Sequence, residues 1–285
     1  YMLEVNFRPG QHGGGPSGAA LTFIGARGAQ LAPLPGPPMR MGGPPDPASD
    51  PLWALELISV GDRDVTDLVI GLNRSLTITG RLQFVGSAPQ PVTQMLQRVT
   101  FQLMSVEMGT QLRSYLGRPD EQGRFAVRGI LPGRYALSYG GFATPGWSNL
   151  KSITAAGVDI TDTLIEVTAD VTDMIVTVSD VPAATISGRV ALAPNEQANS
   201  LAVRLFPDER RYWQDPFGAV RRFKVGRLTA TGSFTMTQVP AGEYLIVVGL
   251  VTDTDVSVET LEILARSAQR VRINDADKLV VEVRR

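Results

Sequence analysis

The stretch Gly232-Ser-Phe-Thr-Met-Thr-Gln-Val-Pro-Ala-Gly-Glu-Tyr244 decides the fold, because an earlier stretch of the chain repeats its pattern. In both copies a glycine, a phenylalanine, a second glycine and a tyrosine recur at an offset of 109 residues. These residues are Gly123, Phe125, Gly133 and Tyr135 in one copy and Gly232, Phe234, Gly242 and Tyr244 in the other. One repeat is therefore about a hundred residues long, which is the size of a small domain.

Two further pairs of segments extend the repeat. Thr77-Ile-Thr-Gly-Arg-Leu82 matches Thr185-Ile-Ser-Gly-Arg-Val190 at an offset of 108 residues, and Asp64-Val-Thr-Asp67 matches Asp159-Ile-Thr-Asp162 at an offset of 95. We therefore predict a partial unit over 1–75, a full unit over 76–180 and a second full unit over 181–285. Because the chain starts at Tyr1 inside a strand-like pattern, we expect it to be a processed or partial piece of a longer product.

The hydrophobic pattern inside each unit is typical of β-strands. Tyr135, Leu137 and Tyr139 alternate with small or polar residues, and this period of two predicts a strand with one buried face. Further strands are predicted over 99–105, 174–178, 201–206, 269–273 and 279–283, with one helix over 259–268. Many short strands separated by turn residues predict an all-β chain of tandem antiparallel β-sandwiches.

The Gly-x-Tyr element has a physical reason to recur. Proline fixes φ and glycine permits positive φ, so together they make a tight entry to a strand. The tyrosine then starts the strand with its ring inward and its hydroxyl near a loop, as a corner tyrosine does. We expect Phe125, Tyr135, Phe234 and Tyr244 to be core residues.

Residues 9–51 form an insertion in the partial unit. Glycine and proline make up 20 of these 43 residues, a composition that holds regular structure poorly. We predict a long irregular loop here, which is ordered only if something packs on it. A tolerated low-complexity insertion is one interpretation, and a specific function of the loop is the other.

The repeated pattern resembles the carboxypeptidase regulatory-like domains, which are transthyretin-like β-sandwiches found in tandem in bacterial envelope proteins. The residues that carry the resemblance are Thr77–Leu82, Gly123–Phe125 and Leu131–Tyr135 in one copy and Thr185–Val190, Gly232–Phe234 and Ala241–Tyr244 in the other. The stretches 147–153 and 205–213 are similar to the same repeat proteins. Ala241 departs from the pattern, since proline is usual there. The resemblance implies an Ig-like or transthyretin-like fold and says almost nothing about activity.

Composition excludes several classes of function. The chain has no cysteine, so disulfide, thiol and zinc-thiolate chemistry are absent, and its net charge of −1 argues against a nucleic-acid binder. No apolar run approaches the length of a membrane span. The one histidine, His12, lies in Gln11-His-Gly-Gly-Gly15, where no carboxylate is positioned to make it a catalytic base. The glycine run also lacks the lysine of a phosphate-binding loop.

Acidic pairs are the next candidates for chemistry. They are Asp62/Asp64/Asp67, Asp159/Asp162, Asp253/Asp255 and Asp275/Asp277. None has the spacing of a calcium-binding loop, so turn residues are the favoured interpretation and a metal or glycosidase site is the alternative. Lys151, Lys224 and Lys278 are the only lysines, and none lies on an early strand where it could form an isopeptide bond with Asn274. We predict no cofactor and no metal.

Aromatic residues are the remaining candidates for ligand or partner contacts. They are Trp53, Trp147, Tyr212, Trp213 and Phe217, of which Tyr212-Trp213 falls in a loop-like region between strands. The favoured interpretation is packing against the rest of the molecule. A partner interface and a carbohydrate platform are the alternatives.

By elimination and resemblance we predict a non-enzymatic extracytoplasmic protein, periplasmic or extracellular and peripheral to a membrane. It would be a structural or docking protein, such as an accessory or scaffold subunit of an envelope or membrane complex. Its partners would be other proteins, with a glycan as a further possibility and no nucleic acid. The alternatives are a carbohydrate-binding module that uses Tyr212 and Trp213, or accessory domains of a larger enzyme or receptor.

Overall fold

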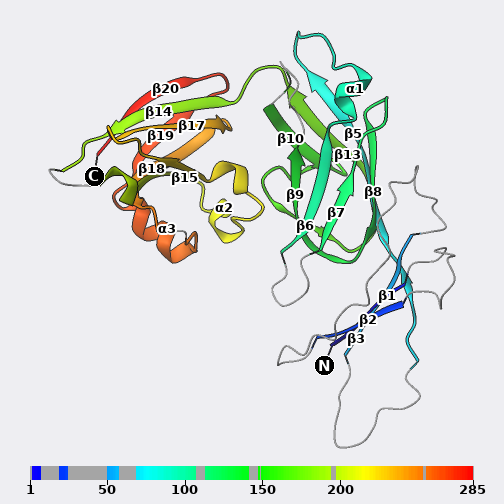
Figure 1. Cartoon of the computed structure of the whole chain (residues 1–285). Coiled ribbons are helices and arrows are strands. Elements are labelled where there is room, and N and C mark those ends of the chain that lie inside the picture. Colours follow the sequence, from blue (N-terminus) through cyan, green and yellow to red (C-terminus); the bar gives the residue numbers. More distant parts are fainter. Residues whose placement is uncertain are drawn as a thin grey trace, which may run out of the picture.

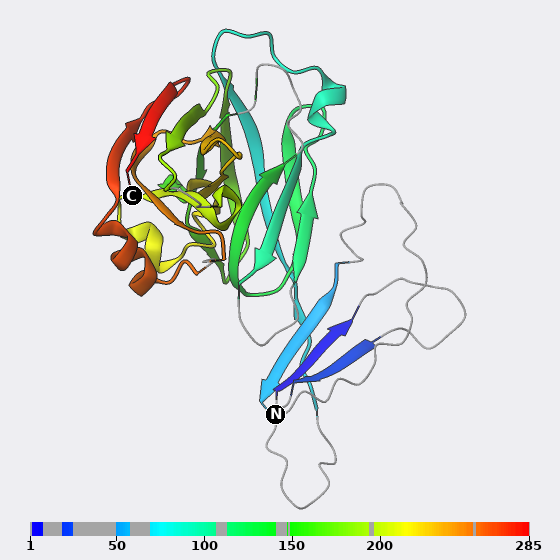
Figure 2. The ribbon, with the colours of Figure 1, turned by 60° about the vertical axis from the view of Figure 1, so that its left-hand side comes forward.

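The structure is a computed structural model that describes residues 2–7, 19–24, 50–57, 69–106, 113–140, 147, 149–193, 197–252 and 255–284. These residues form a small N-terminal sheet, a middle β-sandwich and a C-terminal β-sandwich (Figure 1). In the turned view the two sandwiches lie side by side, and the N-terminal sheet continues from one end of the middle sandwich (Figure 2). No helix in the described part of the chain is long and apolar enough to cross a membrane.

The N-terminal sheet has the strand order β2-β1-β3-β4, and every pair is antiparallel. Its strands are β1 (Met2–Phe7), β2 (Ala19–Ile24), β3 (Leu52–Leu57) and β4 (Asn73–Arg74). The prediction of an irregular loop over 9–51 is wrong for β2. This hexapeptide contains no glycine or proline, and it pairs with β1 along its whole length. Residues 9–18 and 25–49 of the insertion, including His12, lie outside the described residues.

The middle sandwich packs two sheets around one core. Its elements are β5 (Leu76–Val85), α1 (Thr93–Leu96), β6 (Thr100–Ser105), β7 (Ser114–Gly117), β8 (Arg124–Ile130), β9 (Gly133–Gly140), β10 (Asn149–Ala155), β11 (Val158–Asp159), β12 (Leu164–Val167) and β13 (Val171–Ser179). One sheet has the order β11-β10-β13-β5-β8 and the other β12-β9-β6-β7. Side chains of both sheets, such as Ile78, Phe101 and Val176, are buried together between them.

The C-terminal sandwich repeats this plan with fewer strands. Its elements are β14 (Ala184–Val190), β15 (Leu201–Pro207), α2 (Arg211–Gln214), β16 (Lys224–Arg227), β17 (Ser233–Val239), β18 (Gly242–Leu250), α3 (Val258–Ala265), β19 (Gln269–Ile273) and β20 (Lys278–Val283). The sheet orders are β17-β14-β20 and β16-β15-β18-β19. The predicted all-β sandwich class is confirmed. Each sandwich also contains one parallel pair, β5–β13 and β14–β20, which the prediction did not include.

The recurring motif residues occupy equivalent places in the two sandwiches. The predicted core residues Phe125, Tyr135, Phe234 and Tyr244 are all buried. The Tyr135 hydroxyl donates to the Leu131 carbonyl at 2.6 Å, and the Tyr244 hydroxyl donates to the Pro240 carbonyl at 2.9 Å. Each tyrosine therefore fastens its strand to the backbone four residues upstream, as predicted for a corner tyrosine.

The first strand of each sandwich contains a glycine at a position where a larger side chain would not fit. In β5, Gly80 faces the ring of Phe125 and the backbone of β13, and a Cβ there would lie 2.7 Å from Phe125 Cζ. In β14, Gly188 faces Phe234 and β20 in the same way, with a Cβ 2.8 Å from Phe234 Cζ. The glycine of the repeated Thr-Ile-Thr/Ser-Gly-Arg segment therefore makes room for the phenylalanine of the repeated Gly-x-Phe segment.

An extra layer covers the outside of the C-terminal sandwich. Phe206 of β15 and Leu245 and Val247 of β18 point away from the sandwich core and pack with Trp213 of α2 and Leu261 of α3. Because strands β15 and β18 are buried on both faces, their sequences are nearly continuous apolar runs. The predicted helix is confirmed, and it runs from Val258 to Ala265.

Candidate functional site

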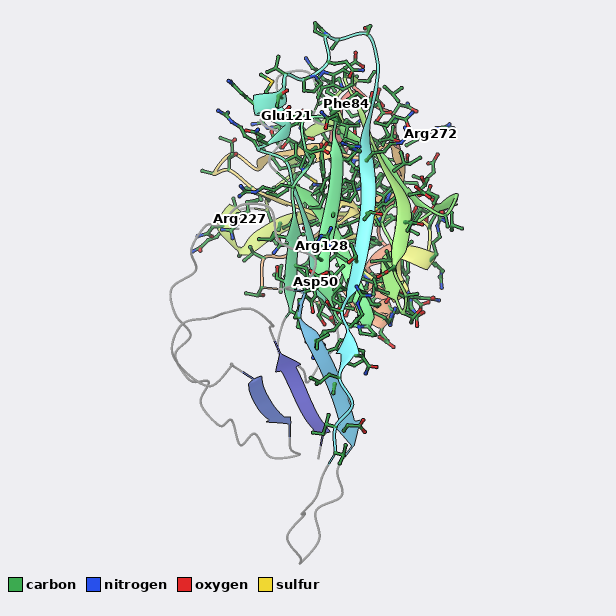
Figure 3. All side chains as sticks on the ribbon, turned by 90° about the vertical axis from the view of Figure 1, so that its right-hand side faces the viewer. Asp50, Phe84, Glu121, Arg128, Arg227 and Arg272 are labelled. Carbon is green, nitrogen blue, oxygen red and sulfur yellow. The ribbon has the colours of Figure 1, made fainter. Side chains whose placement is uncertain are left out.

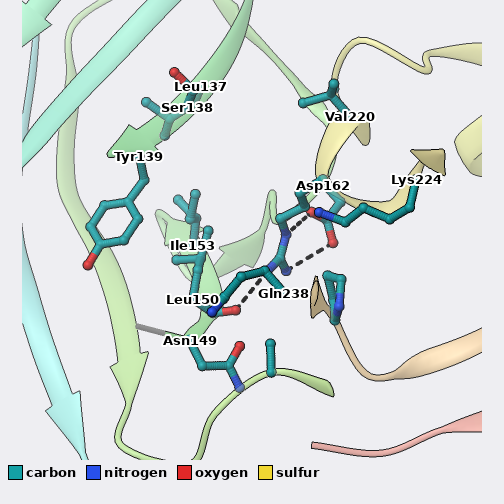
Figure 4. Close-up of a pocket in the computed structure, with 14 residues that line it drawn as sticks. Leu137, Ser138, Tyr139, Asn149, Leu150, Ile153, Asp162, Val220, Lys224 and Gln238 are labelled. Atoms are coloured by element: carbon teal, nitrogen blue, oxygen red, sulfur yellow. Dashed lines mark hydrogen bonds and ion pairs between the residues drawn. The ribbon is translucent and has the colours of Figure 1, made fainter. Parts of the chain in front are cut away.

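A cleft of about 320 Å³ lies where the two sandwiches meet. It is lined on the middle side by residues that include Tyr139, Leu150 and Asp162, and on the C-terminal side by residues that include Val220, Arg221 and Lys224 (Figure 4). Val220 and Arg221 come from the turn that precedes β16, Lys224 is the first residue of β16, and Asp162 comes from the turn after β11. Two loops that the repeat alone would leave on the surface therefore meet across a domain junction.

Asp162 is the centre of this junction. Its side chain is 2% exposed, and its two carboxylate oxygens accept bonds from two arginines of the other sandwich. Arg221 binds Asp162 through Nε and, at 3.1 Å, through Nη2, while Arg222 Nε lies 2.6 Å from the carboxylate. Arg221 also donates to the Leu150 carbonyl at 2.8 Å. Charge-assisted bonds of this kind compensate for the cost of burying the carboxylate.

Arg222 connects the junction to the corner tyrosine. Its Nη1 donates to the Ala241 carbonyl at 3.1 Å and to the Tyr244 hydroxyl at 3.3 Å. Its guanidinium also lies 5.0 Å from the centroid of the Tyr212 ring, a cation–π distance. Burial lowers the pKa of Arg222, but the Asp162 carboxylate together with Tyr244 and Tyr212 opposes this effect, and their combined influence raises the pKa above its ordinary value. Burial raises the pKa of the Tyr244 phenol to about 12, although Arg222 opposes that shift.

Two more polar contacts join the sandwiches. Asp275, in the turn before β20, accepts from Asn149 Nδ2 at 3.0 Å and forms an ion pair with Lys151. Arg134 of β9 forms a more exposed pair with Asp215 at 3.0 Å. Among the residues that the structure describes, three separate ionic contacts cross the junction, and of these the contact at Asp162 is the one whose carboxylate is removed from water.

Gly218 allows the two backbones to approach closely at this junction. A Cβ at Gly218 would lie 2.6 Å from the backbone nitrogen of Leu164 and 2.6 Å from the carbonyl carbon of Thr163. Any side chain at this position would push the sandwiches apart, because both neighbouring groups are backbone atoms. Gly218 comes shortly after α2, so the aromatic cluster of the C-terminal sandwich and the domain contact belong to one continuous segment.

Lys224 points into the cleft near Asp162 (Figure 4). Among the described residues its ammonium group has no hydrogen-bond or ion-pair partner. Burial lowers the pKa of Lys224, and the charge of Arg221 lowers it further. Lys224 is therefore a third cation beside Asp162, in addition to Arg221 and Arg222, which are hydrogen-bonded to this carboxylate.

The predicted aromatic residues are mostly part of the protein interior. Trp147, Tyr212 and Trp213 are buried, so an exposed platform built on Tyr212 and Trp213 is wrong. Trp213 Nε1 donates to the Pro207 carbonyl at 2.7 Å, Trp147 Nε1 to the Pro89 carbonyl at 2.9 Å, and Trp53 Nε1 to the Arg74 carbonyl at 3.1 Å. Internal packing thus accounts for Trp147 and Trp213, whereas Trp53 is half-buried. Phe217 is 67% exposed and lies beside Gly218.

The acidic pairs separate into two roles. Asp159 accepts from Thr161 N at 2.8 Å and Asp277 from Asn274 N at 2.7 Å, which are the turn contacts that the sequence predicts. Asp255 similarly accepts from Ser257 N at 2.8 Å. Asp162 and Asp275, the other members of two of these pairs, instead form ion pairs across the junction. The prediction that the acidic residues only stabilise turns is therefore incomplete for these two. Asp62, Asp64, Asp67 and Asp253 lie outside the described residues.

The residues considered for a metal site and for a cross-link can be located among the described residues. Within the part of the chain that the structure describes, no group of three or more acidic or histidine side chains is arranged to hold a metal ion. The Asn274 side chain donates to Asp277 at 3.2 Å, and Lys151 lies against Asp275 instead.

The sequence analysis missed Arg221, Arg222 and Lys224 as site residues. They place three cations within four positions, and such a run is usually a solvated surface. They could have been found by comparing the two units. One unit has a recurring acidic turn and the next has a basic turn, and neither turn has an opposite charge close in sequence.

No family model matches the chain, and no curated protein sequence matches it. Among solved structures, the chain is similar to the Bacillus anthracis TIE protein at 10% identity and a TM-score of 0.24, over 99% of this chain and 47% of that one. A streptococcal ancillary pilin matches at 15% identity and a TM-score of 0.27, over 82% of this chain and 70% of that one. The minor pilin of Streptococcus agalactiae matches at 9% identity and a TM-score of 0.26, with 74% and 95% covered. TM-scores this low carry no argument about function.

Proposed function

We propose that this chain is a non-enzymatic structural and docking protein of the bacterial envelope. Its sandwiches would act as one rigid body that holds loops and edge strands in fixed positions for a protein partner. The observation that carries the proposal is the buried Asp162 carboxylate, shared between Arg221 and Arg222 of the neighbouring sandwich. The buried carboxylate keeps its charge-assisted bonds to both arginines only in this docked arrangement, so these bonds fix the orientation of one sandwich against the other.

The connections between the units support rigidity as well. Only residues 180–183 separate β13 from β14. Asp180 at the start of this linker accepts from the backbone nitrogens of Ser87 and Ala88 at 2.6 and 2.8 Å. These bonds lower the pKa of Asp180, which stays charged and holds the linker against the end of β5. A short linker that is fixed at one end leaves little freedom for the second sandwich.

The N-terminal sheet is braced against the middle sandwich in a similar way. Ser75 lies between β4 and β5, so one nearly continuous strand passes from one sheet into the other, and its nitrogen donates to the Pro51 carbonyl at 3.2 Å. Asp50 pairs with Arg128 of β8 at 3.5 Å, at the place where the two parts meet (Figure 3).

The envelope location and the partner class rest on the resemblance to carboxypeptidase regulatory-like repeats. We propose an accessory or scaffold subunit of a larger envelope or membrane complex. Gentle solubilisation of native membranes, isolation of the assembly and mass spectrometry test this directly. Stoichiometric recovery with membrane proteins is the expected result. Recovery of the chain alone would contradict the docking role.

The rigidity has a test of its own. Because the chain has no cysteine, two introduced cysteines can be spin-labelled without background. Suitable sites are the exposed Gln122 in the middle sandwich and Arg266 after α3. A narrow distance distribution that broadens with Asp162→Ala is expected. The matched control is Asp215→Ala, which removes the exposed pair with Arg134 and should leave the distribution unchanged. A broad distribution in the parent protein would contradict the rigid-body proposal.

A further inference from the structure

Strand β20 forms an open edge of the C-terminal sandwich. In the sheet β17-β14-β20 it pairs on one side with β14, and no described strand pairs with its other side. It lies at the outer rim of the sandwich and runs away from the junction, which Asp275 in the turn before the strand contacts (Figures 1 and 2). Its parallel pairing with β14 runs without a bulge over Lys278–Val283, and the strand contains no proline. A straight edge of this kind is a template for another strand.

The middle sandwich shows how the same edge is closed. Its equivalent last strand, β13, pairs in parallel with β5 on one side, as β20 pairs with β14. The other side of β13 is covered by β10, which runs antiparallel to it. In the C-terminal sandwich the chain forms α3 before its last two strands, and none of the strands that the structure describes occupies this position. Relative to its repeat, the edge of β20 therefore lacks an antiparallel strand.

The hydrogen-bonding groups that face the open side can be assigned. The Thr185 nitrogen donates to the Asp277 carbonyl at 2.8 Å, and Thr185 lies opposite Lys278. In a parallel ladder a residue bonds to the two residues that flank its opposite number. The backbone groups of Lys278, and by the same alternation those of Val280 and Glu282, therefore point away from β14 into solvent.

The side chains of the same three residues are self-complementary. Val280 is 83% exposed, and Lys278 and Glu282 are exposed on either side of it. In an antiparallel pair centred on Val280, Lys278 of each strand lies opposite Glu282 of the other, and the two valines meet. On the inward face, Leu279 of each strand lies opposite Val281 of the other. Opposite charges and apolar residues that face one another across strands both stabilise a sheet.

Other registers lose this match. A shift of two residues in one direction places Lys278 opposite Arg284, which is a like-charge pair. A shift of two in the other direction places Glu282 opposite Ala276 and leaves both charges unpaired. Shifts of one residue turn the inward-facing side chains outward. The sequence of β20 therefore selects the single register centred on Val280.

We propose that the edge of β20 is a homodimer interface, in which a second copy of this chain adds its own β20 antiparallel across a two-fold axis. The pairing would join two three-stranded sheets into one, with about six new backbone hydrogen bonds from the outward groups of Lys278, Val280 and Glu282. Charged residues on an edge strand ordinarily prevent pairing, but here they attract when the partner is the same strand. The dimer goes beyond the envelope role, since it needs this chain alone.

Sedimentation equilibrium of the full chain tests the proposal, and it should cover about 1 μM to 1 mM because a single-strand interface is small. A reversible monomer–dimer equilibrium is expected. Lys278→Glu and Glu282→Lys each place two like-charge pairs in the interface, so each should raise the dimer dissociation constant by about tenfold or more. The control is Val225→Lys on the edge strand β16, where the exposed valine is not part of the interface.

Two combinations separate the proposed register from a general loss of stability. An equimolar mixture of Lys278→Glu and Glu282→Lys should form a heterodimer, because every charged pair is then attractive. The double variant that carries both substitutions should recover the homodimer. A parent chain that stays monomeric throughout the range would overturn the proposal. A dimer dissociation constant that neither single variant changes would also overturn the proposal. So would the loss of the dimer in Val225→Lys.

Discussion

The middle and C-terminal sandwiches share one plan and differ in the segment between the tyrosine strand and the last strand. After β9, the middle sandwich forms the hairpin β10–β11, which joins the sheet beside β13. After β18, the C-terminal sandwich forms α3, which packs on the outer face of the opposite sheet. The repeated motifs therefore determine the core of each sandwich, whereas the segment between the motifs decides which edges and faces stay open.

The difference also explains why only one of the two sandwiches has a second apolar layer. In β9 the apolar residues Tyr135, Leu137 and Tyr139 alternate with other residues, as one buried face requires. In β18 the run Tyr244–Val247 is buried at every position, because α2 and α3 cover the outer face. The helix replaces a strand in the chain order but covers a different surface.

The largest expected effect tests the plan that the two sandwiches share. Gly80→Ala and Gly188→Ala should each destabilise their own sandwich by about 3 kcal/mol, because the new methyl meets backbone as well as the phenylalanine ring. Hydrogen exchange followed by mass spectrometry, read on peptides of each sandwich, measures the loss. The effect should appear first in the sandwich that carries the substitution.

Each of these variants has a matched control in its own sandwich. Gly140→Ala in β9 and Gly249→Ala in β18 meet neighbours only at ordinary contact distances of 3.4 Å or more, and they should change stability by under about 0.5 kcal/mol. Equal losses at all four glycines would show that backbone flexibility is the cause and would contradict the packing explanation.

A smaller effect should distinguish the two corner tyrosines. Tyr135→Phe removes the hydrogen bond to the buried Leu131 carbonyl, which should cost about 1 kcal/mol. Tyr244→Phe removes the equivalent bond and also the acceptor for Arg222, so we expect about 2 kcal/mol. The spin-label distance distribution should broaden for Tyr244→Phe and stay narrow for Tyr135→Phe. Indistinguishable variants would mean that Arg222 does not couple the corner to the junction.

Much of the shared plan could be predicted from the sequence, because it is encoded in local patterns. The offset of 109 residues between Phe125 and Phe234 and the alternation at Tyr135 indicate the repeat and its strands without any long-range information. The irregular-loop prediction over 9–51 failed at β2, where composition averaged over 43 residues concealed a strand-forming hexapeptide. The continuous apolar run in β18 indicates two buried faces, which the period-two pattern of a strand with one buried face does not describe.

The candidate site could not be predicted in the same way. Asp162 and Arg221 belong to different units and meet only because the sandwiches dock, so no spacing within either unit relates them. Trp213 is an aromatic residue in a loop-like stretch of sequence, as an exposed platform would be. The position of α3 is what shows that this side chain is covered. The junction depends on how the repeats pack against each other, which the repeat itself does not specify.

The smallest effect concerns Lys224, a junction cation that has no hydrogen-bond or ion-pair partner within the described part of the chain. Lys224→Met keeps most of the side-chain volume and removes a charge that has lost water without gaining a hydrogen-bonded partner, so it should stabilise the protein by about 0.5 kcal/mol at pH 7.

The pKa of Lys224 in the folded protein lies below its ordinary value of 10.5, and the unfolded chain therefore binds the proton more tightly. The cost of Lys224 is present in full below the folded pKa and disappears as the pH rises towards 10.5. Urea unfolding of both proteins between neutral and alkaline pH measures this, and the advantage of the variant should shrink as the pH rises. Arg266→Met after α3 removes an exposed cation that belongs neither to the junction nor to the edge of β20, and as the control it should leave the pH dependence of stability as it is in the parent. A variant less stable than the parent at pH 7 would show instead that the ammonium group strengthens the junction.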